Sequence, residues 1–360
     1  MNTKLKKLIS AIGFLVLVIL MLSGLSFICT PTSKTQQQTL LYENEPEDTI
    51  DIAFVGSSAT YRFYDVMTIW EEYNITSMCY FIDSMPYDFV EPMIEYIEEQ
   101  QSPEIYVIDL RHIITDEYKM QYYGSIKTDS QKEAFVNALN LLPNSWVKWE
   151  LITESDYTQD AVYMYWFDVL YNHEEFVEGV YGLIQNGFSL EALPYKGNYL
   201  SYTINDIADT YVDFDTVEEH LDYELTESTI TRLVELFEFC DENEINAYFT
   251  ITPYTHSKCF VDQDIRREFE ELVTEYGYPF KDYKNEMDEI GLDFTTDFYD
   301  KTHANAWGAK KYTLYAMEDI LDVYEVDNTY DQDTIDSWDE AYAEWFIYDE
   351  EMRGASDSDD

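Results

Sequence analysis

Positive charge is scarce in this chain of 360 residues. Only 21 lysines and arginines stand against 73 aspartates and glutamates, which gives a formal net charge of −52 at pH 7. The summed field of such a chain repels the phosphates of nucleic acids, so DNA and RNA are excluded as partners. The field also disfavours other strongly anionic polymers. A plainer explanation stays open, since acidity also keeps a tyrosine-rich protein soluble.

Cysteine and histidine are sparse as well. The four cysteines, at positions 29, 79, 240 and 259, show no C-x-x-C spacing, so neither a zinc motif nor a thiol-redox motif is expected. Cys240 and Cys259 flank one expected strand and are the one plausible disulfide pair. The five histidines form no cluster with aspartates that would indicate a metal site. We therefore expect no metal and no cofactor.

A long apolar run does occur, at the N-terminus. Three lysines within residues 1–7 precede about 22 largely apolar residues at 8–29, which is long enough to cross a bilayer as a helix. The positive-inside rule keeps residues 1–7 in the cytoplasm and exports the rest of the chain. We expect an uncleaved single-pass anchor in the cell membrane, with a cleaved signal peptide as the alternative. Residues 30–48 are polar and predict a flexible stalk.

Strands and helices alternate along most of the remaining chain. Short apolar runs predict strands, and longer stretches with apolar residues every three or four positions predict helices. The expected strands are residues 50–55, 76–81, 104–110 and 245–252, with an apolar stretch at 280–283, and the expected helices are 67–73, 91–100, 226–243, 264–276 and 306–323. This alternation predicts βαβ units and a mainly parallel sheet, hence an α/β fold for residues 49–325.

Two segments depart from the alternation. Residues 112–225 follow the third strand and are rich in aromatic residues. They predict a mostly helical insertion over the carboxyl ends of the strands, where it would shape a cleft. Its aromatic run at 163–167 suits stacking on sugar rings, although packing within the insertion explains the run equally well. Residues 326–353 predict a packed helical extension, and 354–360 an acidic disordered tail.

The candidate chemistry lies in two short segments at opposite ends of this pattern. The first expected strand ends in Gly56-Ser57-Ser58, at the edge where open α/β sheets bind their ligands. Gly56 is expected to make a tight turn that a side chain would block. Asp300 and His303 stand three residues apart, which lets the carboxylate orient the imidazole toward a serine. Alone, each segment is more often a simple turn or helix start; together they predict a Ser-His-Asp triad.

These two segments resemble the SGNH/GDSL hydrolase superfamily, in particular its membrane-anchored members outside the cytoplasm. Such members act in D-alanylation of teichoic acid and in acetylation of exopolysaccharides. The resemblance covers roughly residues 48–124 and 225–325 and implies a three-layer αβα sandwich. It implies that Ser58 is the nucleophile, His303 the general base and Asp300 the residue that orients His303. An Asn-x-x-Gly that often follows in the family corresponds to Asn305 and Gly308.

The family's oxyanion-hole blocks are only partly matched. In the first block Ser57 replaces the family's aspartate, a common variant among the anchored members, and Ser57 is a candidate oxyanion or substrate contact. The second block offers a glycine N–H in the family, whereas the loop here has none, so the N–H of Ser84 or Met85 is the candidate donor. The third block offers an asparagine, which is also missing here. Arg111 is the candidate donor there. The alternative is that Arg111 is tied to neighbouring carboxylates and has a structural role only.

Two classes of function follow from the resemblance. The first is an anchored esterase or O-acyltransferase that forms an acyl-serine on Ser58. It would act on glycan or acyl-ester substrates of the cell envelope, and the net charge favours neutral or zwitterionic glycans. A polytopic membrane acyltransferase is a possible partner. The second is a non-catalytic protein of the same fold that binds a glycan or scaffolds an envelope acylation complex. The incomplete oxyanion blocks are the reason to keep the second class open.

Overall fold

The computed structural model describes residues 3–29, 34–114, 129–142, 146–154, 168–171, 176–177, 180, 192–210, 225–254 and 261–356. The chain divides into two compact units. One comprises Met1–Tyr42 and Phe135–Ala192, and the other comprises Glu43–Ala134 and Leu193–Asp360. We call the first the helical unit and the second the α/β unit.

A five-stranded parallel sheet is the centre of the α/β unit. Its strands run in the order β2-β1-β3-β4-β5, and every neighbouring pair is parallel. They are β1 (Ile52–Gly56), β2 (Ser77–Phe81), β3 (Ile105–Asp109), β4 (Ala247–Ile251) and β5 (Phe280–Asp282). The predicted α/β fold with a mainly parallel sheet is confirmed, and the apolar stretch near residue 280 is its edge strand.

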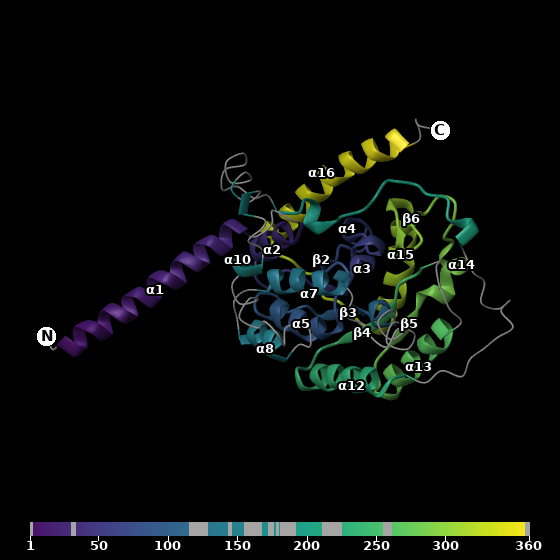
Figure 1. Ribbon diagram of the computed structural model, residues 1–360. Helices are drawn as coiled ribbons and strands as arrows, with labels where there is room; N and C mark the ends of the chain where they lie inside the picture. Colours follow the sequence, from purple (N-terminus) through teal and green to yellow (C-terminus); the bar gives the residue numbers. More distant parts are fainter. Residues whose placement is uncertain are drawn as a thin grey trace. The chain divides into compact units, whose positions relative to one another are not determined.

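Helices flank the sheet on both faces (Figure 1). The first group, on one face, is α3 (Ser58–Phe63), α4 (Val66–Tyr73) and α15 (Ala306–Val323), and the second, on the other, is α5 (Val90–Glu98), α12 (Glu227–Glu242) and α13 (Val261–Glu275). Contacts join α15 to α3 and α4 within the first group, and α12 to α5 within the second. Right-handed crossovers between parallel strands produce this division.

Burial on both faces explains why the strands are continuous apolar runs. Every residue of β1, β2, β3 and β4 is buried, as expected for a parallel sheet covered by helices. The helices are apolar on one side only. In α12 the buried residues are Leu233, Leu236, Phe237 and Cys240, which recur at the three- and four-residue spacing of one helix face. Cys240 is therefore part of the core and is free, while Cys259 lies outside the described residues.

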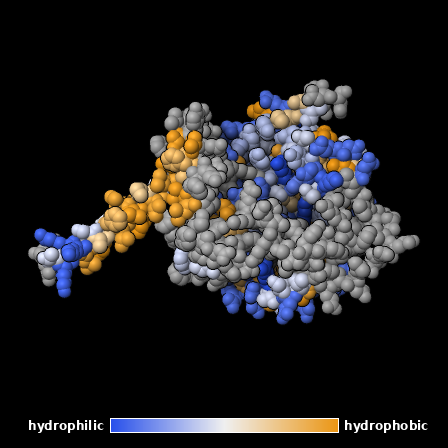
Figure 2. Space-filling model, viewed as in Figure 1, coloured by the Kyte–Doolittle hydropathy of each residue, from blue (hydrophilic) through white to orange (hydrophobic). Residues whose placement is uncertain are grey.

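The helical unit contains the predicted anchor. Helix α1 (Thr3–Cys29) includes 24 residues, Thr3–Ser26, that are long and apolar enough to cross a membrane. Figure 2 shows the continuous hydrophobic surface of α1, with hydrophilic residues at its N-terminal end. These properties fit a single-pass membrane anchor or a signal peptide.

The described part of the predicted insertion is helical up to residue 180 and mostly irregular over residues 192–210. It contains α7 (Asp129–Leu141), α8 (Trp146–Glu154) and α10 (Asp168–Tyr171), followed by the 3₁₀ turns η3 (Tyr195–Gly197) and η4 (Ala208–Thr210). The aromatic run at 163–167 lies outside the described residues. Of the predicted insertion, the residues through Ala134 and those from Leu193 onward belong to the α/β unit, and the residues between them belong to the helical unit.

The prediction of a flexible stalk over residues 30–48 is wrong from residue 34 onward. Residues Lys34–Asn44 form helix α2, whose Leu41 and Tyr42 are buried. The residues after α2 are held by side-chain hydrogen bonds. The Nε2 of Gln101 donates to the carbonyl of Pro46 at 2.7 Å, and Glu45 pairs with Lys196 at 2.9 Å. The apolar residues inside this polar segment are the reason that it folds.

The C-terminal helix is longer than predicted. Helix α16 spans Gln332–Ser356 and buries Trp338 and Trp345, so it packs as expected. It also continues through residues 354–356, which the sequence assigned to a disordered tail. The side chain of Arg353 in its last turns bonds to Asp349 at 2.7 Å and to the carbonyl of Ala306 at 3.3 Å, which stabilises this end of the helix.

Candidate active site

The end of β1 is shaped by a close approach that only glycine permits. A Cβ atom on Gly56 would lie 2.3 Å from the Oγ1 of Thr60 and 3.0 Å from the Cβ of Asp109. The chain turns directly from β1 into helix α3, with Ser57 as the N-cap residue and Ser58 as the first helical residue. The absence of a side chain at Gly56 thus lets the start of α3 lie against the end of β3. This presents Ser58 at the carboxyl end of the central sheet, as the motif predicts.

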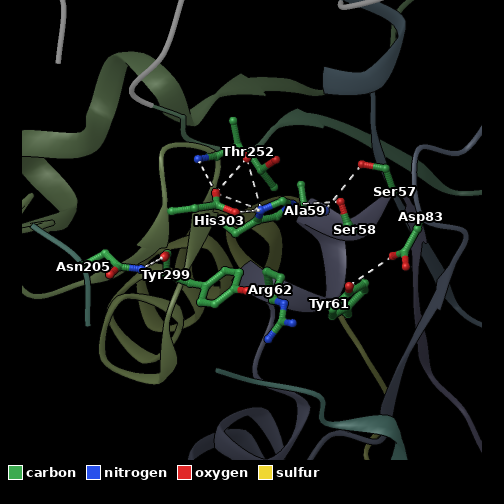
Figure 3. A network of polar contacts seen from close by, with 12 residues as sticks. Ser57, Ser58, Ala59, Tyr61, Arg62, Asp83, Asn205, Thr252, Tyr299 and His303 are labelled. Carbon is green, nitrogen blue, oxygen red and sulfur yellow. Dashed lines mark hydrogen bonds and ion pairs between the residues drawn. The ribbon is translucent and has the colours of Figure 1, made fainter. Parts of the chain in front are cut away.

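Ser58 and His303 are in hydrogen-bonding contact although 245 residues separate them in the chain. The Ser58 Oγ lies 2.8 Å from the Nε2 of His303. Figure 3 shows Ser58 at the start of α3 with the His303 ring beside it. The two side chains come from the first strand–helix turn and from the two-stranded ribbon before α15.

Asp300 contacts the opposite ring nitrogen. The Nδ1 of His303 lies 3.0 Å and 2.9 Å from the two carboxylate oxygens of Asp300. Because a carboxylate only accepts hydrogen bonds, Nδ1 carries the ring proton, which leaves Nε2 as the acceptor for the Ser58 hydroxyl. The three residues therefore have the connectivity of a nucleophile, a base and an orienting carboxylate.

The histidine segment is a compact ribbon with its own support. Strands β6 (Phe298–Asp300) and β7 (His303–Ala304) pair antiparallel and set Asp300 opposite His303. Thr302, between them, donates from its N–H and its Oγ1 to Asp300, each at 2.8 Å. These bonds fix the carboxylate that holds the imidazole.

The Asn-x-x-Gly that follows the histidine has a structural role. Asn305 is the N-cap of α15, and its Oδ1 accepts from the N–H groups of Trp307 and Gly308. A Cβ on Gly308 would lie 2.2 Å from the carbonyl oxygen of Asp297. Glycine is therefore needed for α15 to start this close to the ribbon that carries His303.

The electrostatics favour a neutral imidazole beside an ionised carboxylate. Burial, with added repulsion from Arg111 and Arg62, lowers the pKa of His303 from its ordinary value, although Asp300 opposes the shift. Burial raises the pKa of Asp300, but the hydrogen bonds and charge of His303 and the bonds from Thr302 outweigh it, so the pKa of Asp300 is lowered. At neutral pH His303 can accept a proton and Asp300 stays charged.

The candidate oxyanion donors from β2 and α3 differ in availability. The Met85 N–H donates to the carbonyl of Ile82 at 2.9 Å, so this turn already uses the donor predicted there. Ser84 has a φ of 56°, the left-handed conformation that favours glycine, and within the described residues its N–H has no hydrogen-bond partner. The Ser57 hydroxyl accepts from the N–H of Ala59 at 3.5 Å, as the cap of α3.

Arg111 is tied to backbone carbonyls. Its Nη1 donates to the carbonyl of Pro253 at 2.9 Å, and its Nη2 donates to the carbonyl of Thr302 at 2.5 Å. Asp109, the nearby carboxylate, instead accepts from the backbone N–H of Arg111 at 3.1 Å. The guanidinium thus spans from β3 to the His303 ribbon.

Two residues of the site were not predicted from the sequence. Thr302 donates hydrogen bonds to Asp300, and its position inside the Asp-x-x-His motif could have indicated this role from the sequence. Arg62 lies four residues after Ser58 on α3 and is close enough to lower the pKa of His303. Its position on the same helical face as Ser58 was the second signal.

Comparison with protein-family models, with curated proteins and with solved structures gives no match for this chain. Its function is therefore argued from the geometry of the site.

Proposed function

We propose that this chain is a membrane-anchored serine esterase or O-acyltransferase of the SGNH type, which forms an acyl-serine on Ser58. The observation that carries the proposal is the chain of contacts from Ser58 Oγ through His303 to Asp300, at 2.8 Å and 2.9 Å. Its position at the carboxyl end of β1 in a parallel sheet agrees with the same proposal.

The chemistry follows from the protonation states of these groups. As the Ser58 Oγ bonds to the ester carbonyl carbon, its proton moves to the Nε2 of His303. Asp300 stabilises the imidazolium that forms, because its carboxylate already accepts from Nδ1. Nε2 then gives the proton to the departing alcohol oxygen, and the acyl group remains on Ser58. Water or a glycan hydroxyl, deprotonated by His303, takes the acyl group in the second half of the reaction.

Two backbone N–H groups are the proposed oxyanion donors. Within the described residues, the N–H groups of Ser58 and Ser84 have no hydrogen-bond partner. The register Gly56↔Phe81 between β1 and β2 puts the loops that follow these strands side by side. Ser84 also takes the backbone conformation of a glycine, the residue that the family offers in this loop. A hole built from backbone donors removes the need for the missing asparagine.

The apolar helix α1 supports a proposed site of action at a membrane. We propose that α1 stays uncleaved and that the α/β unit lies outside the cytoplasm, because the lysines precede the apolar run. The substrates would be acyl esters or glycans of the cell envelope near the membrane. A polytopic membrane acyltransferase that delivers an acyl group is the partner that fits a transfer reaction.

One observation favours the second candidate function, a non-catalytic glycan-binding or scaffold protein of the same fold. Two of the predicted donors, the Met85 N–H and the Arg111 guanidinium, are occupied by other partners. A protein of this kind would keep the contacts of Ser58 and His303 without turnover.

Steady-state hydrolysis of 4-nitrophenyl acetate by the full-length chain in detergent separates the two functions. Ser58→Ala should lower kcat/KM by about 10³-fold or more, because it removes the nucleophile. Ser57→Ala is the matched control and should retain a measurable rate, since it costs only a helix cap worth about 1 kcal/mol. Equal rates for the wild type and Ser58→Ala would leave only the binding function.

A further inference from the structure

Arg62 shares a helix face with the proposed nucleophile. Both residues lie on α3, four positions apart. An α-helix rises 1.5 Å per residue, so their backbones are separated by roughly 6 Å along the helix axis. A group close to the carbonyl of an ester bound at Ser58 would therefore be within reach of the Arg62 guanidinium.

Three tyrosine rings surround this guanidinium. The Cζ of Arg62 lies 5.1 Å from the ring centres of Tyr61 and Tyr199 and 5.2 Å from that of Tyr299. Figure 3 shows Arg62 between Tyr61 and Tyr299, next to the Ser58–His303 pair. Rings that contact the faces of a guanidinium fix its orientation and leave its N–H edge for a ligand.

Among the residues that the structure describes, Arg62 has no carboxylate partner, which is unusual in so acidic a chain. Its one hydrogen bond within the described residues is from Nη1 to the carbonyl of Tyr199, at 3.2 Å. Several other cations of the α/β unit are paired with carboxylates, such as Lys310 with Glu71 at 3.1 Å and Lys311 with Asp297 at 2.6 Å. A guanidinium carries five N–H donors, so most of those on Arg62 remain for an anion.

The tyrosine frame is held by its own contacts. Tyr199 follows η3, where Tyr195 and Lys196 both have positive φ angles, of 54° and 53°. Backbone held in this way by non-glycine residues requires firm support and gathers at functional sites. The support comes from Lys196 bonding to Glu45 at 2.9 Å and from Asn198 bonding to Asp65 at 2.9 Å.

Two of the framing rings are accessible to a ligand. Tyr199 is 42% exposed and Tyr299 is 36% exposed, whereas Tyr61 is buried. The Asn205 side chain donates to the carbonyl of Tyr299 and fixes that residue from behind. The site therefore presents a fixed cation between two open aromatic surfaces, within one helical turn of Ser58.

We propose that Arg62 is a specificity-determining residue that binds a carboxylate or phosphate group of the ester substrate. This inference rests on the proposed function, whose substrate it narrows to esters with a negative group close to the reacting carbonyl. It departs from the preference for neutral or zwitterionic glycans drawn from the net charge, because Arg62 and Arg111 both lie close enough to His303 to lower its pKa. The surrounding acidity then excludes long polyanions while Arg62 accepts a single anionic group.

A matched pair of esters tests the proposal. Mono-4-nitrophenyl succinate carries a free carboxylate, and its methyl ester is the uncharged counterpart. The full-length wild type should hydrolyse the anionic ester with the higher kcat/KM. Arg62→Gln should lower the ratio of kcat/KM for the anionic ester to kcat/KM for the uncharged ester by about tenfold or more, as expected for the loss of a charged hydrogen bond. Arg62→Lys should restore part of that ratio, because a lysine keeps the charge without the planar fork.

The control is Arg232→Gln, which removes the same charge from a partly exposed arginine on α12 that pairs with Asp88, and it should leave the ratio unchanged. An equal loss on both esters in Arg62→Gln, or a wild type without preference for the anionic ester, would overturn the proposal.

A binding experiment separates this inference from the failure of the proposed function. Calorimetric titration of Ser58→Ala with the two esters requires no turnover. Tighter binding of the anionic ester, lost in the Ser58→Ala, Arg62→Gln double variant, supports the role of Arg62 even where the wild type hydrolyses neither ester. Equal binding of both esters would reject that role. If the wild type hydrolyses neither ester but still binds the anionic ester selectively, only the proposed enzymatic activity is rejected.

Discussion

The guanidinium of Arg111 donates a hydrogen bond of 2.5 Å to the carbonyl of Thr302, the residue immediately before His303. This bond joins the end of β3 to the ribbon that carries the histidine. A second bond from Arg111, to the carbonyl of Pro253 at 2.9 Å, joins the same side chain to the loop after β4. Arg111 thus helps to hold His303 over Ser58 by joining its ribbon to the sheet.

Arg111 is therefore predicted to be a positioning residue. Arg111→Met should lower kcat, because the Thr302 carbonyl is no longer held and the ribbon can shift. It should also raise the pKa of His303, since the positive charge of Arg111 lowers it. Arg111→Lys should leave that pKa nearly in place while losing rate, because it keeps the charge without the two-pronged contact. The kcat/KM–pH profiles of both variants check this, and profiles identical to that of the wild type would contradict it.

The pH profile of the wild type should place its acid limb below pH 6.5, the ordinary pKa of histidine, because the pKa of His303 is lowered and the neutral imidazole is the base. Activity is retained above this pKa and lost as the pH falls through it. Asp300→Asn should lower the limb further, since Asp300 raises the pKa of His303, and should reduce kcat by about 10³-fold or more. A limb above pH 7 would assign the titration to another group.

A separate prediction concerns stability. Burial, with repulsion from Glu235, Glu95 and Asp88, raises the pKa of Glu91 to about 7. The folded pKa is above the unfolded one, so Glu91 opposes folding increasingly as the pH rises from about 4.5 through 7. Glu91→Gln should raise the free energy of unfolding by about 1 kcal/mol at pH 8, after allowance for its partial exposure, and by much less at pH 4. Urea unfolding at both pH values measures this, and a gain equal at the two would refute it.

The anchor is tested by fractionation. The full-length chain should remain in the membrane after alkaline carbonate extraction, because α1 has the length and composition of a spanning helix. Protease added outside intact cells should remove the α/β unit and leave the lysine-bearing end protected. Recovery of a soluble chain that begins near residue 30 would instead indicate a cleaved signal peptide.

Local patterns in the sequence were sufficient to predict the sheet. Four strands are buried on both faces, so their apolar runs are continuous and easily recognised. The prediction was wrong where a few apolar residues lie within a polar stretch. Leu41 and Tyr42 anchor α2 inside the segment read as a stalk. The end of α16 depends on Arg353, whose contact with Ala306 joins segments distant in the chain.

Within the candidate site, too, contacts that local sequence determines were predictable, and contacts between distant segments were not. Ser58, Asp300 and His303 were predictable because short fixed spacings specify their local turns. The use of Arg111 and Met85 was not, because it depends on which carbonyl groups the loops bring within reach. Arg62 acquires its role only through Tyr199 and Tyr299, each at least 130 residues away in the chain.

The most direct test of the central claim is covalent labelling by an uncharged fluorophosphonate, with the modified residue located by mass spectrometry of the digested full-length chain. A nucleophile activated by His303 should give a phosphonylated peptide modified at Ser58, absent in Ser58→Ala and strongly slowed in His303→Ala. The Ser57→Ala variant should label at Ser58 as the wild type does. Modification of Ser57, or no labelling of the folded wild type, would contradict the assignment of Ser58 as the nucleophile.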